Sequence, residues 1–415
     1  MILTKYKLGD ILDVTRGASL SGEFYATKGE YIRLTCGNFD YQNNCFKENK
    51  SKDNLYYVGD FKPEFLMEEG DIITPLTEQA IGLLGSTAII PESGKYIQSQ
   101  DVAKIICNED LLDKDFAFYL ISSALVKQQL SAAAQQTKIR HTSPDKIKDC
   151  TVWIPELAEQ KRIGKLLRSI DRKIELNRAI NQNLEAMAKQ LYDYWFVQFD
   201  FPNEEGKPYK SSGGEMVWNE KLKRKIPNEW DNCKLKDFIN LFDSKRIPLS
   251  SKDREERKGN YPYYGATGIM DYVNEYIFDG DYILLAEDGS TSDSKGFPIV
   301  QYIWGKNWVN NHAHIILPKN EQYLMFTYQM LRSIPAKQIE TGSIQKKISQ
   351  ENLCEYNMVL PNSILIEKYE SIISPLWEKR KLCIEEINAL IKQRDELLPL
   401  LMNGQASVNS DLSLG

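Results

Sequence analysis

The chain carries an internal repeat. Shifting the sequence by 206 positions superposes residues 137–141 on residues 343–347, and Pro155 on Pro361. Upstream the two copies continue with insertions, so that Leu8 matches Leu235 within similar segments. Each copy joins short strand-like runs of β-branched and aromatic residues to a long helical pattern. We therefore predict one unit present twice, in the order globular domain, helix, globular domain, helix.

The second part of each copy has a seven-residue hydrophobic period. With charged residues between the apolar ones, this period is typical of long helices that pair through a seam. Each helix has roughly 40 residues and would be about 60 Å long. Asn177 and Asn181 on the seam are expected to lower stability but favour one register. Pro375 is expected near the start of the second helix and Pro399 near its end, where proline interferes least. The predicted helix-pairing residues are Ile163, Ile170, Asn177, Leu184, Leu191, Tyr369, Leu376, Cys383, Leu390 and Leu397.

Composition narrows the class of protein. A chain of 415 residues is too long for a single domain with one hydrophobic core. A content of 42% hydrophobic and 27% charged residues is typical of globular domains. The sequence has neither a signal-like start nor an apolar run of roughly 20 residues, so we expect a cytoplasmic protein. Its seven cysteines are scattered, which indicates reduced thiols. The net charge of −6 argues against nucleic-acid binding unless cations gather locally or partners supply them.

Several segments are more specific than the repeat. The central connection contains YWFVQFDFP at 194–202, GKPYK at 206–210 and Ile226-Pro227. The second half contains YPYYGATG at 261–268, EDGS at 287–290 and NNHAH at 310–314, and the end reads ELLPLLMNG at 396–404. In this order, and over essentially the whole chain, these segments resemble the specificity subunits of Type I restriction-modification enzymes.

The resemblance implies an α+β fold in which two similar mixed α/β target-recognition domains are separated by two long antiparallel coiled-coil-like helices with a pseudo-two-fold repeat. It predicts a first recognition domain at 1–155, a central helix at 156–200, a connector at 201–230, a second recognition domain at 231–361, a C-terminal helix at 362–404 and a tail at 405–415. Its implied partners are double-stranded DNA, two modification (methyltransferase) subunits and restriction (translocase-nuclease) subunits, with no membrane.

The repeated loops are the main candidates for DNA contact. Small polar side chains can read base edges, while lysine and arginine hold phosphates. The paired loops contain Thr137, Lys138, Arg140 and His141 in the first copy, and Ser343, Gln345, Lys346 and Lys347 in the second. A solvated charged loop is the alternative for either copy.

Other candidates lie near the first strand-like run of each copy or in polar loops. Gln98 and its neighbours match Asn310–His312, and glutamine and asparagine suit bidentate adenine contacts, although hydrogen bonding within a domain is their commoner use. An ordinary turn and core packing of one tyrosine remain alternatives for the rest. The full set is Arg16, Ser19, Gln98, Gln100, Lys245, Arg246, Tyr263, Tyr264, Thr267, Asn310, Asn311 and His312.

Catalytic motifs are missing from the sequence. His312 and His314 have no evident acidic or cysteine partner, so we expect no metal site. Glu256-x-Lys258 has nuclease-like spacing, with Asp243 and Asp253 upstream, but lies in a charge run and is interpreted as solvated. There is no phosphate-binding G-x-x-x-x-G-K-[ST] segment and no methyltransferase signature. We therefore expect no cofactor and no catalytic residue, with a coiled-coil scaffold that does not bind DNA as the main rival and a cryptic nuclease around Glu256 as the second.

Overall fold

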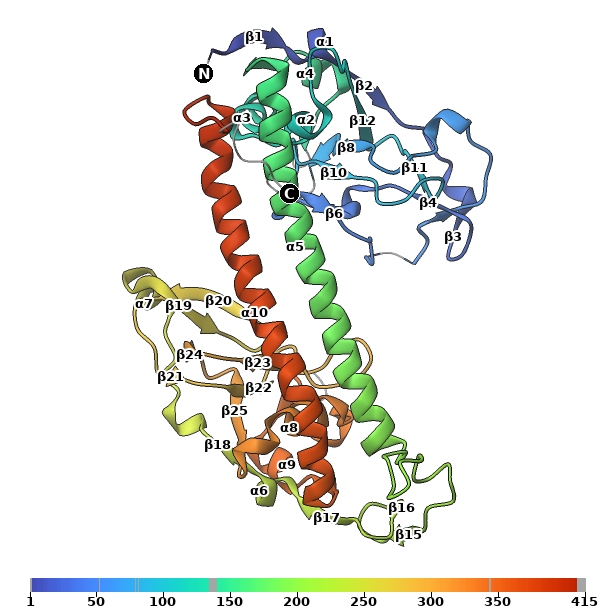
Figure 1. Ribbon diagram of the computed structural model, residues 1–415, viewed down its shortest axis with the longest axis vertical. Helices are drawn as coiled ribbons and strands as arrows, with labels where there is room; N and C mark the ends of the chain where they lie inside the picture. Colours follow the sequence, from blue (N-terminus) through green and yellow to red (C-terminus); the bar gives the residue numbers. More distant parts are fainter. Residues whose placement is uncertain are drawn as a thin grey trace. The chain divides into compact units, whose positions relative to one another are not determined.

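The computed structural model describes residues 2–51, 53–78, 80, 82–133, 140–342 and 345–408. It divides into two compact units, Met1–Asn177 with Glu385–Gly415, and Arg178–Ile384. Each unit contains one globular domain and one segment of each long helix, α5 (Leu157–Tyr192) and α10 (Ser363–Met402) (Figure 1). The predicted order of domain, helix, domain, helix is confirmed, and the two units are described separately below.

The first globular domain is built on two four-stranded sheets. One has the order β10-β8-β12-β2, and its strands are Ala88–Ile89, Ile72–Pro75, Val102–Cys107 and Leu12–Arg16. The other has the order β11-β4-β7-β3, with strands Tyr96–Ile97, Tyr31–Arg33, Tyr56–Tyr57 and Tyr25–Ala26. All four residues of β8 are buried, as expected for a central strand of largely β-branched residues.

Shorter elements complete the first domain. β1 (Thr4–Lys7) pairs with β14 (Thr151–Ile154) and so joins the start of the domain to its end. β5 (Phe39–Asp40) pairs with β6 (Cys45–Phe46), and β9 (Thr77–Glu78) with β13 (Arg140–His141). The helices are α1 (Leu8–Ile11), α2 (Lys114–Ile121), α3 (Ala124–Ala133) and α4 (Pro144–Lys148). The core of this unit includes residues of both domain and long helices, such as Phe116, Ile163 and Leu401.

The second globular domain repeats this plan. One sheet has the order β18-β25-β22-β23, with strands Ile239–Leu241, Ala313–Pro318, Tyr282–Ala286 and Val300–Ile303. The other has the order β20-β19-β24-β21, with strands Ile269–Val273, Lys258–Tyr264, Lys306–Val309 and Phe278–Asp279. The shorter strands are β15 (Met216–Asn219), β16 (Arg224–Pro227), β17 (Asp231–Lys234), β26 (Glu340–Thr341), β27 (Lys347–Ile348) and β28 (Asn357–Leu360). The helices are α6 (Leu235–Phe238), α7 (Ser251–Glu256), α8 (Leu324–Ser333) and α9 (Gln350–Glu355).

The strand registers confirm the repeat. Ile105 lies opposite Ile72 in the first domain, and Ile316 lies opposite Ile283 in the second. Both residues of the second pair are 211 positions after their counterparts, so the same two strands are paired in the same register. The ends of the domains agree as well, because Tyr6 opposite Val152 corresponds to Cys233 opposite Met358.

The long helices run antiparallel within each unit. In the first unit Ile170 and Ile174 of α5 pack against Ile387 of α10. In the second unit a later part of α5 meets an earlier part of α10, where the Tyr369 hydroxyl donates to the Ala188 carbonyl at 3.1 Å. All the predicted helix-pairing residues are buried or half-buried. On the seam, Asn177 donates to Glu386 at 2.8 Å, so this polar position has a specific partner.

The expectation for Pro375 was wrong. Helix α10 begins at Ser363 and runs through Pro375, which therefore lies in the helix interior. Proline removes one helical hydrogen bond there. The helix nevertheless continues because Tyr369, Ile373 and Trp377, on both sides of the proline, are each at most 1% exposed. Tertiary packing offsets the local cost, while Pro399 lies in the last turn of α10 as predicted.

Ion networks, buried in the first unit and half-buried in the second, join each domain to both long helices. In the first unit Asp171 of α5 accepts from Tyr119 of α2 at 2.5 Å and from Arg394 of α10 at 2.9 Å. In the second unit Glu185 of α5 pairs with Arg332 of α8 at 2.8 Å and with Arg380 of α10 at 3.0 Å. Each network joins three elements through charged groups, which favours one arrangement of domain and helices within its unit.

The connector belongs to the second unit. Phe201 stacks on both Tyr209 and Trp230, with ring centroids 4.7 and 5.1 Å apart. Trp230 also contacts Phe196, in the π-helical turn Asp193–Val197 that follows α5. This aromatic cluster ends the helix and holds the chain where it enters the second domain. Within the described part of the chain, no helix combines the length and apolar character needed to cross a bilayer.

Candidate nucleic-acid interface

The repeated loops occupy the same position in both domains. In the first, β13 pairs with β9, and the amide of Thr142 donates to the carbonyl of Leu76 at 2.9 Å. In the second, Lys347 bridges to Asp288, and the amide of Ile348 donates to the carbonyl of Glu287 at 2.8 Å. Each loop is thus fixed just beyond the end of a central strand, β8 or β22. Thr137, Lys138 and Ser343 lie outside the described residues.

Four candidates of the first domain, Arg16, Gln100, Arg140 and His141, lie at this edge. The side chain of Arg16 donates to the carbonyl of Gln100 at 2.8 Å. Next to Gln100, Asp101 lies 3.4 Å from the Thr77 hydroxyl, which is 3.3 Å from Nδ1 of His141. Arg140 approaches Glu78 at 3.6 Å. Arg16, Ser19, Gln100 and His141 are exposed, and Arg140 is half-buried.

In the second domain Arg246, Asn311, His312 and Lys347 lie around the equivalent edge. Arg246 pairs with Glu287 at 2.8 Å and also donates to the backbone carbonyl of Asn311 at 3.4 Å. Lys347 pairs with the same glutamate at 3.1 Å. His312 contacts Asp288 at 2.7 Å, so the loops at 310–312 and 345–347 are neighbours. Lys245, Thr267, Asn311, His312, Gln345, Lys346 and Lys347 are exposed, and Arg246 and Tyr264 are half-buried.

Three candidates lie inside their domains. Gln98 is 2% exposed and donates to the carbonyls of Thr15 and Val102. Asn310 is 3% exposed and accepts from the amide of His312, while Tyr263 is 1% exposed and bonds the backbone of Leu249. Hydrogen bonding within the domain, the alternative for these residue types, is what the structure shows, and we leave the three out of the proposed interface.

The matching of the two polar loops was also off by one residue. The strand registers of the two domains show that His312 is the repeat counterpart of Asp101, and not of Gln100. The match relied on the polar character of the side chains. The register instead follows the buried strands, whose alternation does not permit a one-residue slip.

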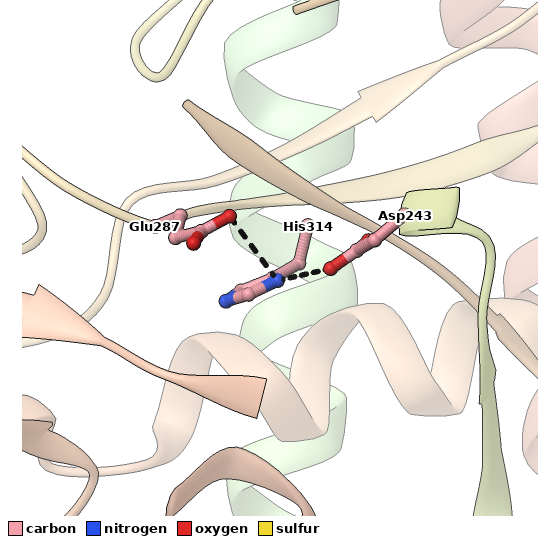
Figure 2. A group of neighbouring side chains, drawn as sticks. All are labelled: Asp243, Glu287 and His314. Carbon is pink, nitrogen blue, oxygen red and sulfur yellow. Dashed lines mark hydrogen bonds and ion pairs between the residues drawn. The ribbon is translucent and has the colours of Figure 1, made fainter. Parts of the chain in front are cut away.

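A buried carboxylate–histidine cluster underlies the second edge (Figure 2). His314 of β25 is 0% exposed, with Nδ1 2.6 Å from Asp243 and 3.7 Å from Glu287. The expectation that this histidine lacks an acidic partner was therefore wrong. Asp243 precedes His314 by 71 residues, and only the pairing of β18 with β25 brings the two together.

Charges in the cluster are balanced by the chain itself. Nε2 of His314 faces the Ile348 carbonyl at 2.8 Å, so both ring nitrogens meet acceptors and both contacts are hydrogen bonds only in the doubly protonated ring. Burial alone would raise the pKa of Asp243, but hydrogen bonds from His314, Ile315 and Gln350 and the charge of His314 lower it below its ordinary value. The pKa of Glu287 is likewise lowered, because Arg246, Lys347 and His314 outweigh its burial.

These three side chains are close enough to be considered as metal ligands. A metal ion would have to replace the proton between His314 Nδ1 and Asp243, while Asp243 already accepts from the Ile315 amide and the Gln350 side chain, and Glu287 is paired with Arg246 and Lys347. Arg246 and Lys347 also supply positive charge to the carboxylates. The donor set does not fit a metal ion, and the cluster instead fixes the loop that carries Lys347.

The nuclease-like residues do not share one site. Lys258 pairs with Asp271 at 2.6 Å, and Glu256 approaches Lys252 at 4.0 Å. Asp253 accepts from Ser250 at the start of α7, while Asp243 lies in the histidine cluster. Each group therefore has a separate local role.

Comparisons with known proteins agree with this architecture. A family model described as the Type I restriction modification DNA specificity domain matches residues 3–186 and 227–386. The MjaIX specificity subunit of Methanocaldococcus jannaschii is 23% identical over 323 residues, covering 73% of this chain and 71% of that protein. A putative specificity subunit of Haemophilus influenzae is 34% identical over 142 residues, covering 34% of this chain and 35% of that protein.

A solved structure supports the fold. The S subunit of a Type I restriction-modification system from M. genitalium superposes with a TM-score of 0.61 at 18% identity, covering 97% of this chain and 96% of that chain. The family model covers well over half of the sequence and matches it twice, in agreement with the internal repeat. The chain is therefore a member of the Type I restriction-modification specificity subunits.

Proposed function

We propose that this chain is the DNA-recognition and assembly subunit of a Type I restriction-modification complex. The domains at 1–155 and 231–361 each read one half of a bipartite, asymmetric DNA site. The two long helices dock two modification subunits, and restriction subunits join the assembly. Methyl transfer and cleavage take place on the partners, and this chain contributes no catalytic residue.

The main support for DNA recognition is the convergence of separate segments on one edge of each domain. The two edges share backbone geometry, yet His141 in the first corresponds to Lys347 in the second. A symmetric dimer would read a palindrome, because its two surfaces are the same. Two domains with one framework and different side chains suit two unlike half-sites.

The overall charge is compatible with this role. Cations at the edges pair with carboxylates, as in Arg140 with Glu78 and Lys346 with Glu340 at 3.0 Å. The side chains of Arg140 and Lys346 are 41% and 52% exposed and have further N–H donors, so each can contact a phosphate while it stays paired with its carboxylate, despite the net charge of −6.

Partner docking is supported by an apolar groove on the long helices of the second unit. Its exposed large apolar residues are Met187, Tyr194 and Ile372, which are 53%, 38% and 45% exposed. Contiguous exposed apolar surface is typical of protein interaction sites. In the repeat, Tyr194 corresponds to Leu400 of the first unit, which is 41% exposed, whereas Ile372 corresponds to Leu166, which packs against the core of that unit.

Mapping methylated bases in a methylation-free host tests the proposed function. Expressing the chain with its modification subunit is expected to give a split adenine-methylated motif that disappears when this chain is omitted. A stable complex that produces no motif would favour the rival role, a coiled-coil scaffold that does not read DNA.

Lys346→Ala is expected to weaken DNA binding with little change in sequence preference. Lys346 is exposed and its ammonium group acts as a point charge, so loss of one phosphate contact should reduce the slope of log affinity against log salt by about one. Titrations of the complex at several salt concentrations measure the slope. Lys207→Ala, an exposed lysine of the connector, is the matched control, and an unchanged slope in Lys346→Ala would exclude a phosphate contact.

Gln345→Ala is expected to have the opposite signature. An exposed glutamine that reads a base edge contributes discrimination, so its loss should relax one base position by about 1–3 kcal/mol while leaving the salt slope unchanged. Competition binding with duplexes carrying single base-pair changes measures this effect. Discrimination retained at every position would remove Gln345 from the reading set.

A further inference from the structure

Three polar positions coincide between the two domains. The carbonyl of Asp101 accepts from the amide of Leu76 at 2.8 Å, and the carbonyl of His312 accepts from the amide of Glu287 at 2.8 Å. One residue further along, Thr77 pairs with His141, and Asp288 bridges to Lys347. The repeat thus superposes Asp101, Thr77 and His141 on His312, Asp288 and Lys347.

In the first domain Thr77 is the middle residue of the set, and its side chain contacts the two outer residues, Asp101 and His141. The Thr77 side chain lies 3.4 Å from the Asp101 carboxylate and 3.3 Å from Nδ1 of the His141 ring. Thr77 itself is 8% exposed, whereas Asp101 is half-buried and His141 exposed. The outward groups of this set are a carboxylate, which accepts hydrogen bonds, and an imidazole.

In the second domain the same places carry different chemistry. Asp288 accepts from Nδ1 of His312 at 2.7 Å and so fixes the ring, while its backbone pairs with that of Lys347. The side chains of His312 and Lys347 are 47% and 53% exposed. The Lys347 ammonium is anchored to Glu287 on one side but has three donors, so it can still contact a ligand.

We propose that these positions determine which bases the two half-sites contain. In each domain the middle residue positions the outer pair, and the outer pair contacts base edges. The Asp101 carboxylate accepts from an exocyclic amine, on cytosine N4 or adenine N6, in the half-site of the first domain. Lys347, with His312 beside it, donates to O6 and N7 of guanine in the half-site of the second domain.

Surrounding residues favour base reading over a purely structural network. Backbone hydrogen bonds are the same in both copies, so the fold does not require these particular side chains. An exposed cation lies near each set. Arg16 donates to the carbonyl of Gln100, the residue before Asp101, and Lys245 precedes Arg246, which pairs with the same glutamate as Lys347. Such cations suit phosphates on either side of a base contact. This inference rests on the proposed function, since it assigns specificity within the same edges.

The test uses the full chain in complex with its modification subunit. Its methylated motif is determined first, and binding is then measured to a panel of duplexes that replace each base pair of that motif. Lys347→Gln is expected to lose about 10-fold or more discrimination at one guanine position of one half-site. Asp101→Ala should do the same at one position of the other half-site, and each variant should leave the opposite half unchanged.

Two variants guard against misfolding and non-specific effects. Lys347→Arg retains donors for guanine and is expected to keep the base discrimination of the parent chain. Lys346→Gln should reduce affinity for every duplex without altering base discrimination. If Lys347→Gln and Asp101→Ala bind more weakly but discriminate at every position within about twofold of the parent chain, the inference is overturned. A parent complex that methylates no motif would instead overturn the proposed function, on which the inference depends.

Discussion

Arg394→Met is expected to lower the free energy of unfolding by about 3–5 kcal/mol. Arg394 and Asp171 are 7% and 8% exposed, and their side chains meet at 2.9 Å. Removing the guanidinium leaves the Asp171 carboxylate buried with only the Tyr119 hydroxyl as its other described side-chain partner. An unpaired buried charge costs far more than the pair contributes, so the loss should be large.

Denaturant unfolding of the full chain, followed by circular dichroism, measures this effect. The double variant Arg394→Met with Asp171→Asn removes both charges but keeps an acceptor for Tyr119, so it should recover most of the lost stability. Arg172→Met, an exposed arginine on the same helix as Asp171, is the matched control. A loss below about 1 kcal/mol in Arg394→Met would show that the carboxylate is solvated in the folded protein.

Glu370→Gln is expected to stabilise the second unit above neutral pH. Glu370 of α10 is 7% exposed and accepts from the amide of Phe326 at 2.7 Å, at the start of α8. Burial raises the pKa of this carboxyl to about 7, and the hydrogen bonds from Phe326, Ser374 and Met325 only partly oppose it. The ionised form is therefore held in the folded protein at a cost.

The sign of the pH dependence follows from this raised pKa. The folded state binds the Glu370 proton more tightly than the unfolded state, in which the carboxyl has its ordinary pKa of 4.5. Its contribution to stability is complete below about pH 4.5 and is lost as pH rises through about 7, a total of about 3 kcal/mol. Glutamine keeps an acceptor oxygen and cannot ionise, so the variant should escape this loss.

Unfolding free energies of the parent and Glu370→Gln chains, measured from pH 5 to pH 8, isolate the effect as their difference. The variant should gain relative to the parent by about 3 kcal/mol or less as pH rises, with most of the change between pH 5 and pH 7. Glu351→Gln, an exposed glutamate of α9, should give a flat difference. A flat difference for Glu370→Gln as well would mean that its carboxyl is already hydrated.

The position of Glu370 also shows how the two copies of the repeat diverged. The repeat places Gly164 of α5 where α10 has Glu370. In the first unit α2 is capped by its own Asp113, which accepts from the Phe116 amide at 2.9 Å. A Cβ at Gly164 would lie 2.8 Å from that Asp113 oxygen. One copy thus caps its helix locally, and the other uses a carboxylate from the long helix.

The architecture could be predicted from the amino-acid sequence, because its signals are local and occur twice. The heptads predict α5 and α10, since the buried face of a helix repeats with the helical period. The shift of 206 residues pairs the loops at 137–141 and 343–347, and their described parts are fixed by equivalent backbone bonds. Exposed candidates such as Arg16 and Lys347 were also identifiable, because charged residues in loops between strands face solvent.

The partners of the buried polar groups, in contrast, could not be predicted before the fold was known. Asp171 and Arg394 are 223 residues apart, and Asp243 and His314 are 71 apart, so no local pattern connects them. Gln98 and Asn310 are of residue types that usually lie at the surface, but both are buried in their domains, where backbone groups need hydrogen-bond partners. Pro375 remains within a helix because buried neighbours outweigh one missing hydrogen bond. Periodicity records which face of an element is buried, whereas the partner of a buried polar group depends on chain segments that only folding brings together.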